Sequence, residues 1–259
     1  MAKGLTAALG LGPREHVAFV GGGGKTNLME ALARELTLGE ARVVTTTTTK
    51  LRQSEARRFP CTILCASGSH WHEKLRDGLE RYGSVFVARR FIEPEKVEGI
   101  NPQLADSLFK DPLVDYLIVE ADGSAGRPLK APATHEPVIP SSVSLVVAVI
   151  GLEAIGRPLG SQVVFRPEFY ERVTGLKQGL MLTPDTIAKI FRSSQGLFKN
   201  TPHSARRVAF LNKLDLLSDH QKARELTDLL LQGPHPAVDA VVSGSVLEKS
   251  YRLVERQQE

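Results

Sequence analysis

The sequence predicts an α/β protein in which a mostly parallel sheet is flanked by helices. The first reason is alternation: short β-branched runs such as Val17–Val20 are followed by longer segments of helical periodicity such as Thr26–Leu36. The second reason is composition, since 259 residues with 42% hydrophobic and 24% charged side chains suffice to bury one large core. No low-complexity linker divides the chain, so we expect a single domain over residues 1–259.

The expected elements follow one another regularly along the chain. Strands are predicted at the short apolar runs 17–20, 42–46, 62–65, 85–88, 116–120, 145–150, 208–211 and 238–242. Helices are predicted at 26–36, 71–82, 103–109, 168–173, 186–192 and 221–231. Three helices have start signals, which are Ser69, Asn101-Pro102 and Thr183-Pro184. The longest loop is expected at 121–140, and 166–200 is expected to be largely helical.

Composition and charge exclude several classes of partner. The longest apolar run, Leu145–Ile150, is much shorter than the roughly 20 residues that cross a bilayer, and no credible signal-peptide cleavage site is present. We therefore expect a cytoplasmic protein without a membrane partner. The net charge is only +4, its cations are scattered, and aromatics make up 6% of the chain, so nucleic acid is not an expected partner. Cys61 and Cys65 lack the two further ligands that a zinc site would need.

The strongest functional signal is a glycine loop between the first strand and the first long helix. Glycine amides and a helix N-terminus can bind a polyphosphate, Lys25 can reach its outer phosphates, and the Thr26 hydroxyl can ligate Mg²⁺. The full motif has glycine where this chain has Phe19. The order of strand, loop, Lys-Thr and helix still predicts a P-loop NTPase of three layers. The expected phosphate-binding residues are Gly21, Gly22, Gly23, Gly24, Lys25, Thr26 and Asn27.

A base-binding site is predicted near the C-terminus. Asn212-Lys213-Leu214-Asp215 follows an apolar strand, and in GTP-binding proteins the aspartate of this element accepts hydrogen bonds from guanine N1–H and its amine. Adenine lacks that donor pair, so GTP is expected over ATP. After one more helix and strand, Ser243 and Gly244 occupy the place of the last base-contacting loop.

Acidic residues are predicted to lie beside the phosphates. Glu120 ends a buried strand and is followed by Asp122 and Gly123, so Glu120 is expected to hold Mg²⁺, Asp122 to help position water, and the Gly123 amide to sense the γ-phosphate. The alternative is a solvated turn at a strand end. Thr45–Thr49 follows the second strand, and Thr48 or Thr49 is expected to face the metal, with Thr48 preferred.

The 121–140 loop carries Arg127, Lys130, His135 and Glu136 directly after the predicted magnesium ligand. A charged, proline-containing loop in that place suits a nucleotide-dependent switch or a surface that binds a client protein. The alternative is an ordinary surface loop.

Together these motifs resemble the YqeC family. The resemblance rests on Gly21–Thr26, Thr45–Lys50, Glu120–Gly123 with the loop up to Pro140, and Asn212–Asp215. Members of that family are described as accessory proteins of selenium-dependent molybdenum hydroxylases. The resemblance implies a P-loop NTPase fold and a maturation role, with a molybdenum hydroxylase or its cofactor-loading machinery as partner. Glu120-x-x-Gly123 is also similar to the corresponding element of GTPases that deliver metal cofactors.

Three functions remain open from the sequence. The first is a Mg²⁺-dependent GTP-binding protein with slow GTPase activity, in which Lys25, Glu120 and Asp122 serve hydrolysis. The second is a kinase or nucleotidyltransferase that uses ATP or GTP to modify a small molybdenum cofactor held by Arg127, Lys130 and His135. The third is a chaperone that holds a cofactor and has a vestigial nucleotide site. A homodimer is a further expectation, because related delivery GTPases often dimerise.

Overall fold

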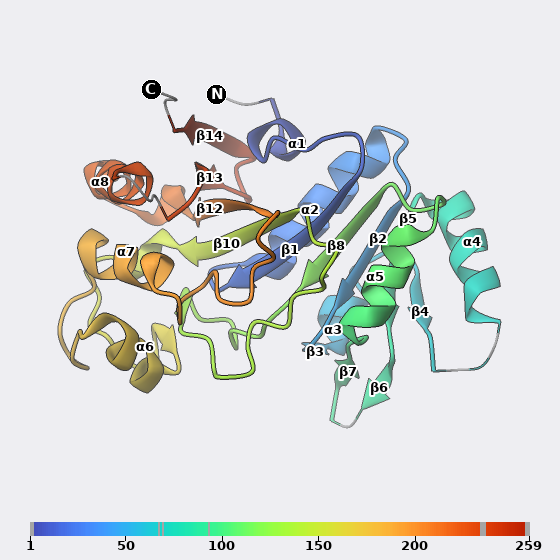
Figure 1. The fold of residues 1–259 in the computed structure, drawn as a ribbon, viewed down its shortest axis with the longest axis horizontal. Coiled ribbons are helices and arrows are strands. Elements are labelled where there is room, and N and C mark those ends of the chain that lie inside the picture. The colour runs from blue at the N-terminus through green and yellow to red at the C-terminus, as the bar shows by residue number, and fades with distance from the viewer. Residues whose placement is uncertain (1–2, 67, 69, 93, 234–236, 257–259) are drawn as a thin grey trace.

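The fold is built on one nine-stranded sheet (Figure 1). The computed structural model describes residues 3–66, 68, 70–92, 94–233 and 237–256. Among the described strands of this sheet, the edge strand β14 alone runs antiparallel to its neighbour. The strand order is β14 (Ser250–Glu255), β13 (Ala240–Ser245), β12 (Arg206–Asn212), β10 (Leu145–Gly151), β1 (Glu15–Gly21), β8 (Tyr116–Glu120), β2 (Val43–Thr47), β5 (Ser84–Ala88) and β4 (Thr62–Leu64).

Helices cover both faces of the sheet, as the sequence predicts. One face packs against α1 (Leu5–Ala8), α2 (Lys25–Leu38) and α3 (Gln53–Ala56). The other face packs against α4 (Trp71–Tyr82), α5 (Pro102–Lys110), α6 (Pro167–Thr174), α7 (Pro184–Arg192) and α8 (His220–Leu231). Side chains of β1 alternate between these cores, with Phe19 on the α2 side and Ala18 and Val20 on the other.

The expected elements are present with small shifts at their ends. Two helix starts follow the predicted chemistry, because Asn101 accepts a hydrogen bond from the Leu104 amide and Thr183 accepts one from the Thr186 amide. Ser69, the start signal expected for α4, lies outside the described residues. The described part of the chain contains no helix that is long and apolar enough to span a membrane.

The sequence missed several short elements. They include the edge strand β14, the helices α1 and α3, and a small antiparallel sheet of β3 (Lys50–Arg52), β7 (Lys96–Glu98) and β6 (Arg90–Ile92). A second small sheet joins β9 (Leu129–Lys130) to β11 (Val164–Phe165). The short 3₁₀ turns η1 (Leu152–Ala154) and η2 (Leu214–Leu216) follow β10 and β12. Strands of two or three residues are too short to show a period in the sequence.

The 121–140 loop differs most from expectation. It is largely without regular structure, but its centre is buried: Lys130 and Glu136 are only 1% and 5% exposed, whereas His135 is exposed. The sequence suits a switch or a client-binding surface at this loop, and Lys130 and Glu136 do not contribute to such a surface. The physical reason is that each is paired with an opposite charge, which allows burial of groups that otherwise stay in water.

Candidate functional site: a glycine loop at the carboxyl edge of the sheet

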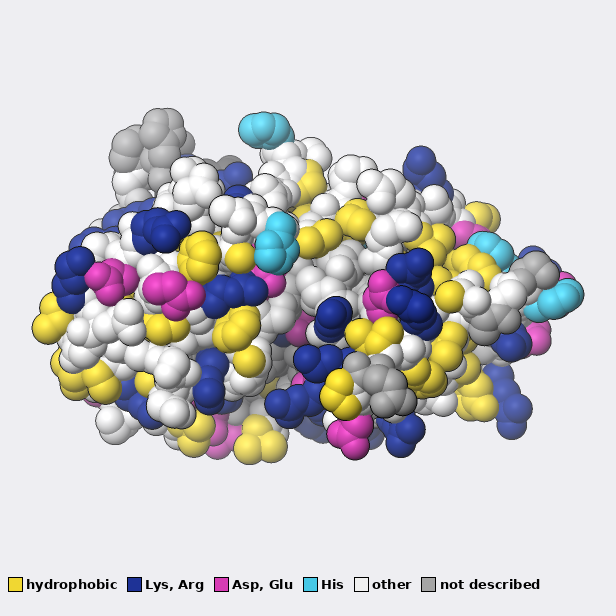
Figure 2. All heavy atoms as spheres, turned by 90° about the horizontal axis from the view of Figure 1, so that it is seen from below, with side chains coloured by type: hydrophobic (Ala, Val, Ile, Leu, Met, Phe, Trp, Pro, Cys, Tyr) yellow, Lys and Arg dark blue, Asp and Glu magenta, His cyan; other side chains and the backbone are white. Residues whose placement is uncertain are grey.

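The predicted site lies at the carboxyl ends of the central strands. Figure 2 views the molecule from this lower edge, where Lys and Arg side chains gather around the middle of the face with acidic side chains among them. Strand register sets the positions, because Glu120 at the end of β8 pairs with Phe19 of β1 on one side and Thr47 of β2 on the other. In parallel sheets this edge, where strand order reverses, is the usual place for a ligand.

The glycine loop is short and closely packed. Strand β1 continues through Gly21 and α2 begins at Lys25, so Phe19 is a buried strand residue and not part of the loop. A Cβ on Gly23 would lie 2.1 Å from the Gly151 nitrogen, and Gly23 has φ of 70°. Both facts exclude a larger residue at this point, where the loop passes the end of β10.

The loop amides divide into two groups. The amide of Gly22 donates to Val149 O and that of Gly23 donates to Arg127 O. In the described part of the chain, the amides of Gly24, Lys25 and Thr26 donate no hydrogen bond. They lie at the N-terminus of α2, where orphan N–H groups and the helix dipole favour an anion.

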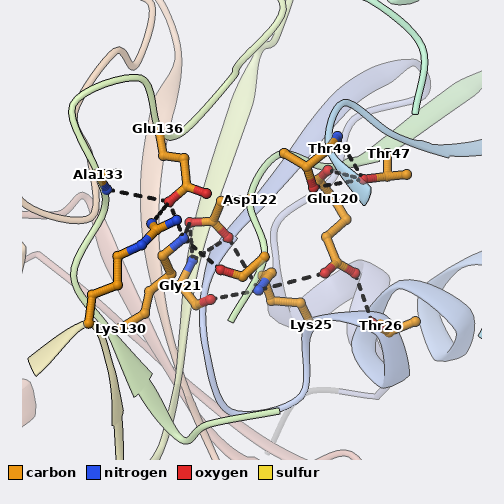
Figure 3. A network of polar contacts seen from close by, with 12 residues as sticks. Gly21, Lys25, Thr26, Thr47, Thr49, Glu120, Asp122, Lys130, Ala133 and Glu136 are labelled. Carbon is orange, nitrogen blue, oxygen red and sulfur yellow. Dashed lines mark hydrogen bonds and ion pairs between the residues drawn. The ribbon is translucent and has the colours of Figure 1, made fainter. Parts of the chain in front are cut away.

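Lys25 is buried among oxygen atoms (Figure 3). Its ammonium donates to Gly21 O at 2.6 Å and forms ion pairs with Asp122 at 3.2 Å and Glu120 at 3.7 Å. Burial disfavours the charged ammonium, but the two carboxylates outweigh it and raise the pKa of Lys25 above its ordinary value. Lys25 is thus held as a cation at the glycine loop.

Thr26 and Glu120 form a pair of oxygen donors. The Thr26 hydroxyl donates to Glu120 Oε2 at 2.8 Å, and burial raises the pKa of Glu120 although Lys25 lies nearby. Mg²⁺ uses only one or two protein oxygens and completes its octahedron with water and phosphate. This donor pair therefore fits the predicted magnesium site. The described residues contain no cluster of three or more His, Cys, Asp or Glu side chains that could enclose a metal by themselves.

The threonine run is arranged around Glu120. Thr47 Oγ1 donates to the Glu120 carbonyl at 2.9 Å, and Thr49 Oγ1 lies 3.3 Å from Thr47 Oγ1. Thr48, the preferred metal ligand in the sequence, instead donates its hydroxyl to Val138 O at 2.7 Å. Thr48 thus joins β2 to the 121–140 loop, and its ligation of a metal stays a prediction.

A second ion cluster extends the site away from α2. Asp122 is 1% exposed and lies between Lys25 and Lys130, each 3.2 Å from one of its oxygens. Lys130 also pairs with Glu136 at 2.7 Å, and Arg166 forms a further ion pair with Glu136. Burial opposes ionisation of Glu136, but Lys130 and Arg166 prevail and lower the pKa of Glu136. Sequence reasoning missed Arg166, because 30 residues separate it from Glu136 and no local pattern links them.

The predicted base-binding residues lie on the other side of the glycine loop. Asn212 is 4% exposed, and its amide nitrogen donates to Gly23 O at 2.8 Å while its amide oxygen accepts from the Val246 amide at 3.2 Å. Lys213 forms an ion pair with Glu153, and Asp215 is exposed. Asn212 therefore joins the glycine loop to the chain after β13.

A cavity of about 790 Å³ adjoins this element. Asn27, Asn212, Lys213, Asp215, Ser245 and Leu247 are among the residues that line it. Ser243 and Gly244 do not line it: both lie inside β13, and a Cβ on Gly244 would lie 2.0 Å from Ser250 O of β14. The wall facing the base-binding residues begins at Ser245, a shift of two residues from the expected loop. The reason is the unpredicted β14, which extends β13 by pairing with it.

Fold and glycine loop together define an α/β protein with a P-loop fold. The family model described as "YqeC protein" matches residues 17–168. "Uncharacterized protein YqeC" of Escherichia coli (strain K12) is 33% identical over 232 residues, which cover 90% of this chain and 88% of that protein. The chain belongs to the YqeC family, and the resemblance seen in the sequence is confirmed.

Two solved structures have a distantly similar fold. Chloroplast FtsY from Physcomitrella patens is 13% identical with a TM-score of 0.47, and the match covers 96% of this chain and 65% of that chain. The hydrogenase maturation factor HypB from Archaeoglobus fulgidus is 12% identical with a TM-score of 0.42, over 91% of this chain and 83% of that chain. At these values neither likeness says what this protein binds.

Proposed function

We propose that the protein is a Mg²⁺-dependent GTP-binding protein with slow GTPase activity. The observation that carries this proposal is the position of Asn212, which bonds Gly23 O of the phosphate loop and lines the same cavity as Lys213 and Asp215. A phosphate-binding loop and a base-binding element are thus joined by one buried side chain. Asp215 is an acceptor suited to the paired donors of guanine.

Each residue of the proposed site has a definite task. The free amides of Gly24, Lys25 and Thr26 and the Lys25 ammonium bind phosphate oxygens, while Thr26 and Glu120 hold the metal. When bound, Mg²⁺ supplies positive charge to the phosphates and orders the oxygens around the phosphorus atom. Burial of Lys25 and Glu120 excludes water from their contacts, which strengthens the electrostatic interactions there.

The proposed biological role is maturation of a selenium-dependent molybdenum hydroxylase. The role is the one that the resemblance to the YqeC family implies. In support of it, Thr48 and the Glu136–Arg166 ion pair link the proposed nucleotide site to the 121–140 loop and to the start of α6, where a partner could bind. The test is to compare hydroxylase activity and cofactor content in cells that carry the wild-type protein, the Lys25→Ala variant or no copy of the gene. Normal activity and cofactor content without the protein would contradict the role.

A second candidate is transfer of a phosphoryl or nucleotidyl group to a small molybdenum cofactor. The buried Lys130 and the half-buried Arg166 favour it, because Lys130 pairs with Asp122 beside the glycine loop, Arg166 pairs with Glu136, and both cations exceed what nucleotide binding alone requires. Product analysis with nucleotide labelled in the γ- or α-phosphate separates the candidates. Release of free phosphate without labelled cofactor supports the GTPase, whereas labelled cofactor supports transfer.

A further inference from the structure

The carboxylate of Asp122 is bound by donor groups of the kind that bind phosphate in other proteins. Both of its oxygens lie 3.1 Å from the Gly21 amide nitrogen, so this loop amide donates to the carboxylate. The ammonium groups of Lys25 and Lys130 each lie 3.2 Å from an Asp122 oxygen. A phosphate site typically contains backbone amides and ammonium groups around a buried oxyanion. Here one loop amide and two ammonium groups surround the chain's own carboxylate in the same way (Figure 3).

Lys130 is the part of this set that a simple P-loop does not require. Its side chain is 0% exposed, and its ammonium also donates to Gly123 O at 2.7 Å and to Glu136 at 2.7 Å. A buried ammonium loses much hydration free energy, so a structural role alone would be met as well by an apolar side chain of similar size. A buried ammonium group such as that of Lys130 can instead serve to bind a further anion.

The partners of the two lysines would remain in place if Asp122 were replaced by another anion. Lys25 keeps Glu120 at 3.7 Å and Gly21 O, while Lys130 keeps Glu136 and Gly123 O. Each ammonium therefore retains one carboxylate and one carbonyl oxygen as partners. The carboxylate is the exchangeable member of the cluster.

We propose that Asp122 is a resident anion which competes with nucleotide phosphate for Lys25 and Lys130, and that Lys130 is a second phosphate-binding lysine. The proposal rests on the nucleotide site proposed above. It gives Asp122 a role opposite to the one expected from the sequence, where Asp122 assists metal and water: its carboxylate weakens phosphate binding and keeps both lysines paired until a phosphate arrives.

Calorimetry with pyrophosphate and with GTP, each with and without Mg²⁺, tests this assignment on the full chain. Asp122→Asn preserves side-chain size and removes the charge, and we expect it to bind both ligands about tenfold more tightly than the wild type. Asp228→Asn is the matched control, because Asp228 is an exposed carboxylate on α8 and its loss changes net charge equally. We expect that control to stay within about twofold of the wild type, since exposed charges are screened by salt.

The role of Lys130 is tested in the same series. Lys130→Met is expected to weaken pyrophosphate binding about tenfold and, when combined with Asp122→Asn, to abolish most of the gain in affinity from that substitution. Lys130→Arg is expected to preserve both the pyrophosphate affinity and the gain. Thermal unfolding shows whether each variant is folded, and Glu136→Gln tests whether loss of any carboxylate beside Lys130 has the same effect. Weaker or unchanged pyrophosphate binding by folded Asp122→Asn overturns the proposal.

Pyrophosphate also separates this inference from the proposed function. It has no base, so a tenfold gain for Asp122→Asn combined with equal affinities for GTP and ATP would uphold the inference and contradict guanine recognition. Preference for GTP without a gain for Asp122→Asn would uphold the proposed function and overturn the inference. If neither the wild type nor Asp122→Asn binds pyrophosphate or GTP, both are wrong.

Discussion

At the scale of single residues, the site is defined by buried charges that compensate one another. Lys25 is a cation because Asp122 and Glu120 lie beside it, and Glu120 is a potential metal ligand because Thr26 orients its carboxylate. None of these groups would be stable at such depth without its partners. The pairs therefore hold in position the side chains that the proposed nucleotide would contact.

The first residue-level prediction concerns Lys25. Lys25→Ala removes a charge-assisted hydrogen bond to phosphate, which contributes about 1.5–3 kcal/mol. We expect the Kd for Mg²⁺-GTP to rise roughly 10- to 100-fold in calorimetry. Lys222→Ala, a change on α8 that also removes one cation, is the control. Equal losses in the two variants would show that only overall charge matters.

A second prediction concerns recognition of the base by Asp215. Asp215→Asn replaces one acceptor by an amide donor, which no longer matches both guanine donors but matches the carbonyl that xanthine carries in place of the amine. We expect this variant to lose affinity for GTP and to gain affinity for XTP in a competition titration. Indifference of GTP binding to Asp215→Asn would exclude this residue from base recognition.

A third prediction follows from His16, at the start of β1 and far from the site. Burial lowers the pKa of His16 from 6.5 to about 3, although the nearby Asp106 opposes the shift. Between pH 6.5 and about pH 3 the unfolded chain therefore binds a proton at His16 that the folded chain does not bind. The free energy of unfolding consequently decreases as pH falls through this window. At 1.36 kcal/mol per pH unit the loss attributable to His16 is at most about 5 kcal/mol.

Urea unfolding of the wild type and His16→Asn between pH 7 and pH 4 measures this contribution. The variant carries no titrating ring, so its free energy of unfolding should decrease less steeply with falling pH. Parallel curves for the two proteins would show that the ring is neutral in both states or accessible to protons in the fold.

At the scale of elements, the segments that follow the neighbouring strands hold the glycine loop in place. Asn212, at the end of β12, bonds Gly23 O and accepts from the Val246 amide. Asn212→Ala leaves both backbone groups without this partner, at a cost of about 1–3 kcal/mol in the free energy of unfolding. We expect weaker GTP binding as well, measured by calorimetry on the folded variant. Unchanged GTP affinity would separate the base-binding element from the phosphate loop.

The sequence predicted the long central elements and the glycine loop because both have local signals. Eight strands of the large sheet show as β-branched runs, and Gly21–Thr26 is contiguous in the chain. The edge strand β14 was missed because Ser250–Glu255 mixes polar and apolar residues and buries mainly Tyr251. The contacts of Lys130 with Asp122 and of Arg166 with Glu136 could not be predicted, because they depend on how the 121–140 loop folds back.

At the scale of the whole molecule, one continuous sheet carries both halves of the site. The glycine loop follows β1 in the centre, and the predicted base-binding residues follow β12, two strands away in the sheet. We predict that residues 1–259 unfold in one cooperative transition, observed as coincident curves from circular dichroism and tryptophan fluorescence. Two separated transitions would contradict the single domain.

Ligand binding should stabilise this whole unit. A nucleotide at 100 times its Kd adds about 2.7 kcal/mol to the free energy of unfolding if it binds only the folded chain. The transition should therefore shift to higher temperature with Mg²⁺-GTP for the wild type, and much less for Lys25→Ala. An equal shift in both proteins would place the nucleotide elsewhere.

The central claim is that this chain binds a guanine nucleotide through the glycine loop and the Asn212–Asp215 element. The most direct measurement is the Kd of the full chain for GTP and for ATP in the same buffer with Mg²⁺, obtained by calorimetry. We predict binding of GTP at least about tenfold tighter than that of ATP, a difference of about 1.4 kcal/mol. Equal affinities, tighter binding of ATP, or no binding of either nucleotide would contradict the claim.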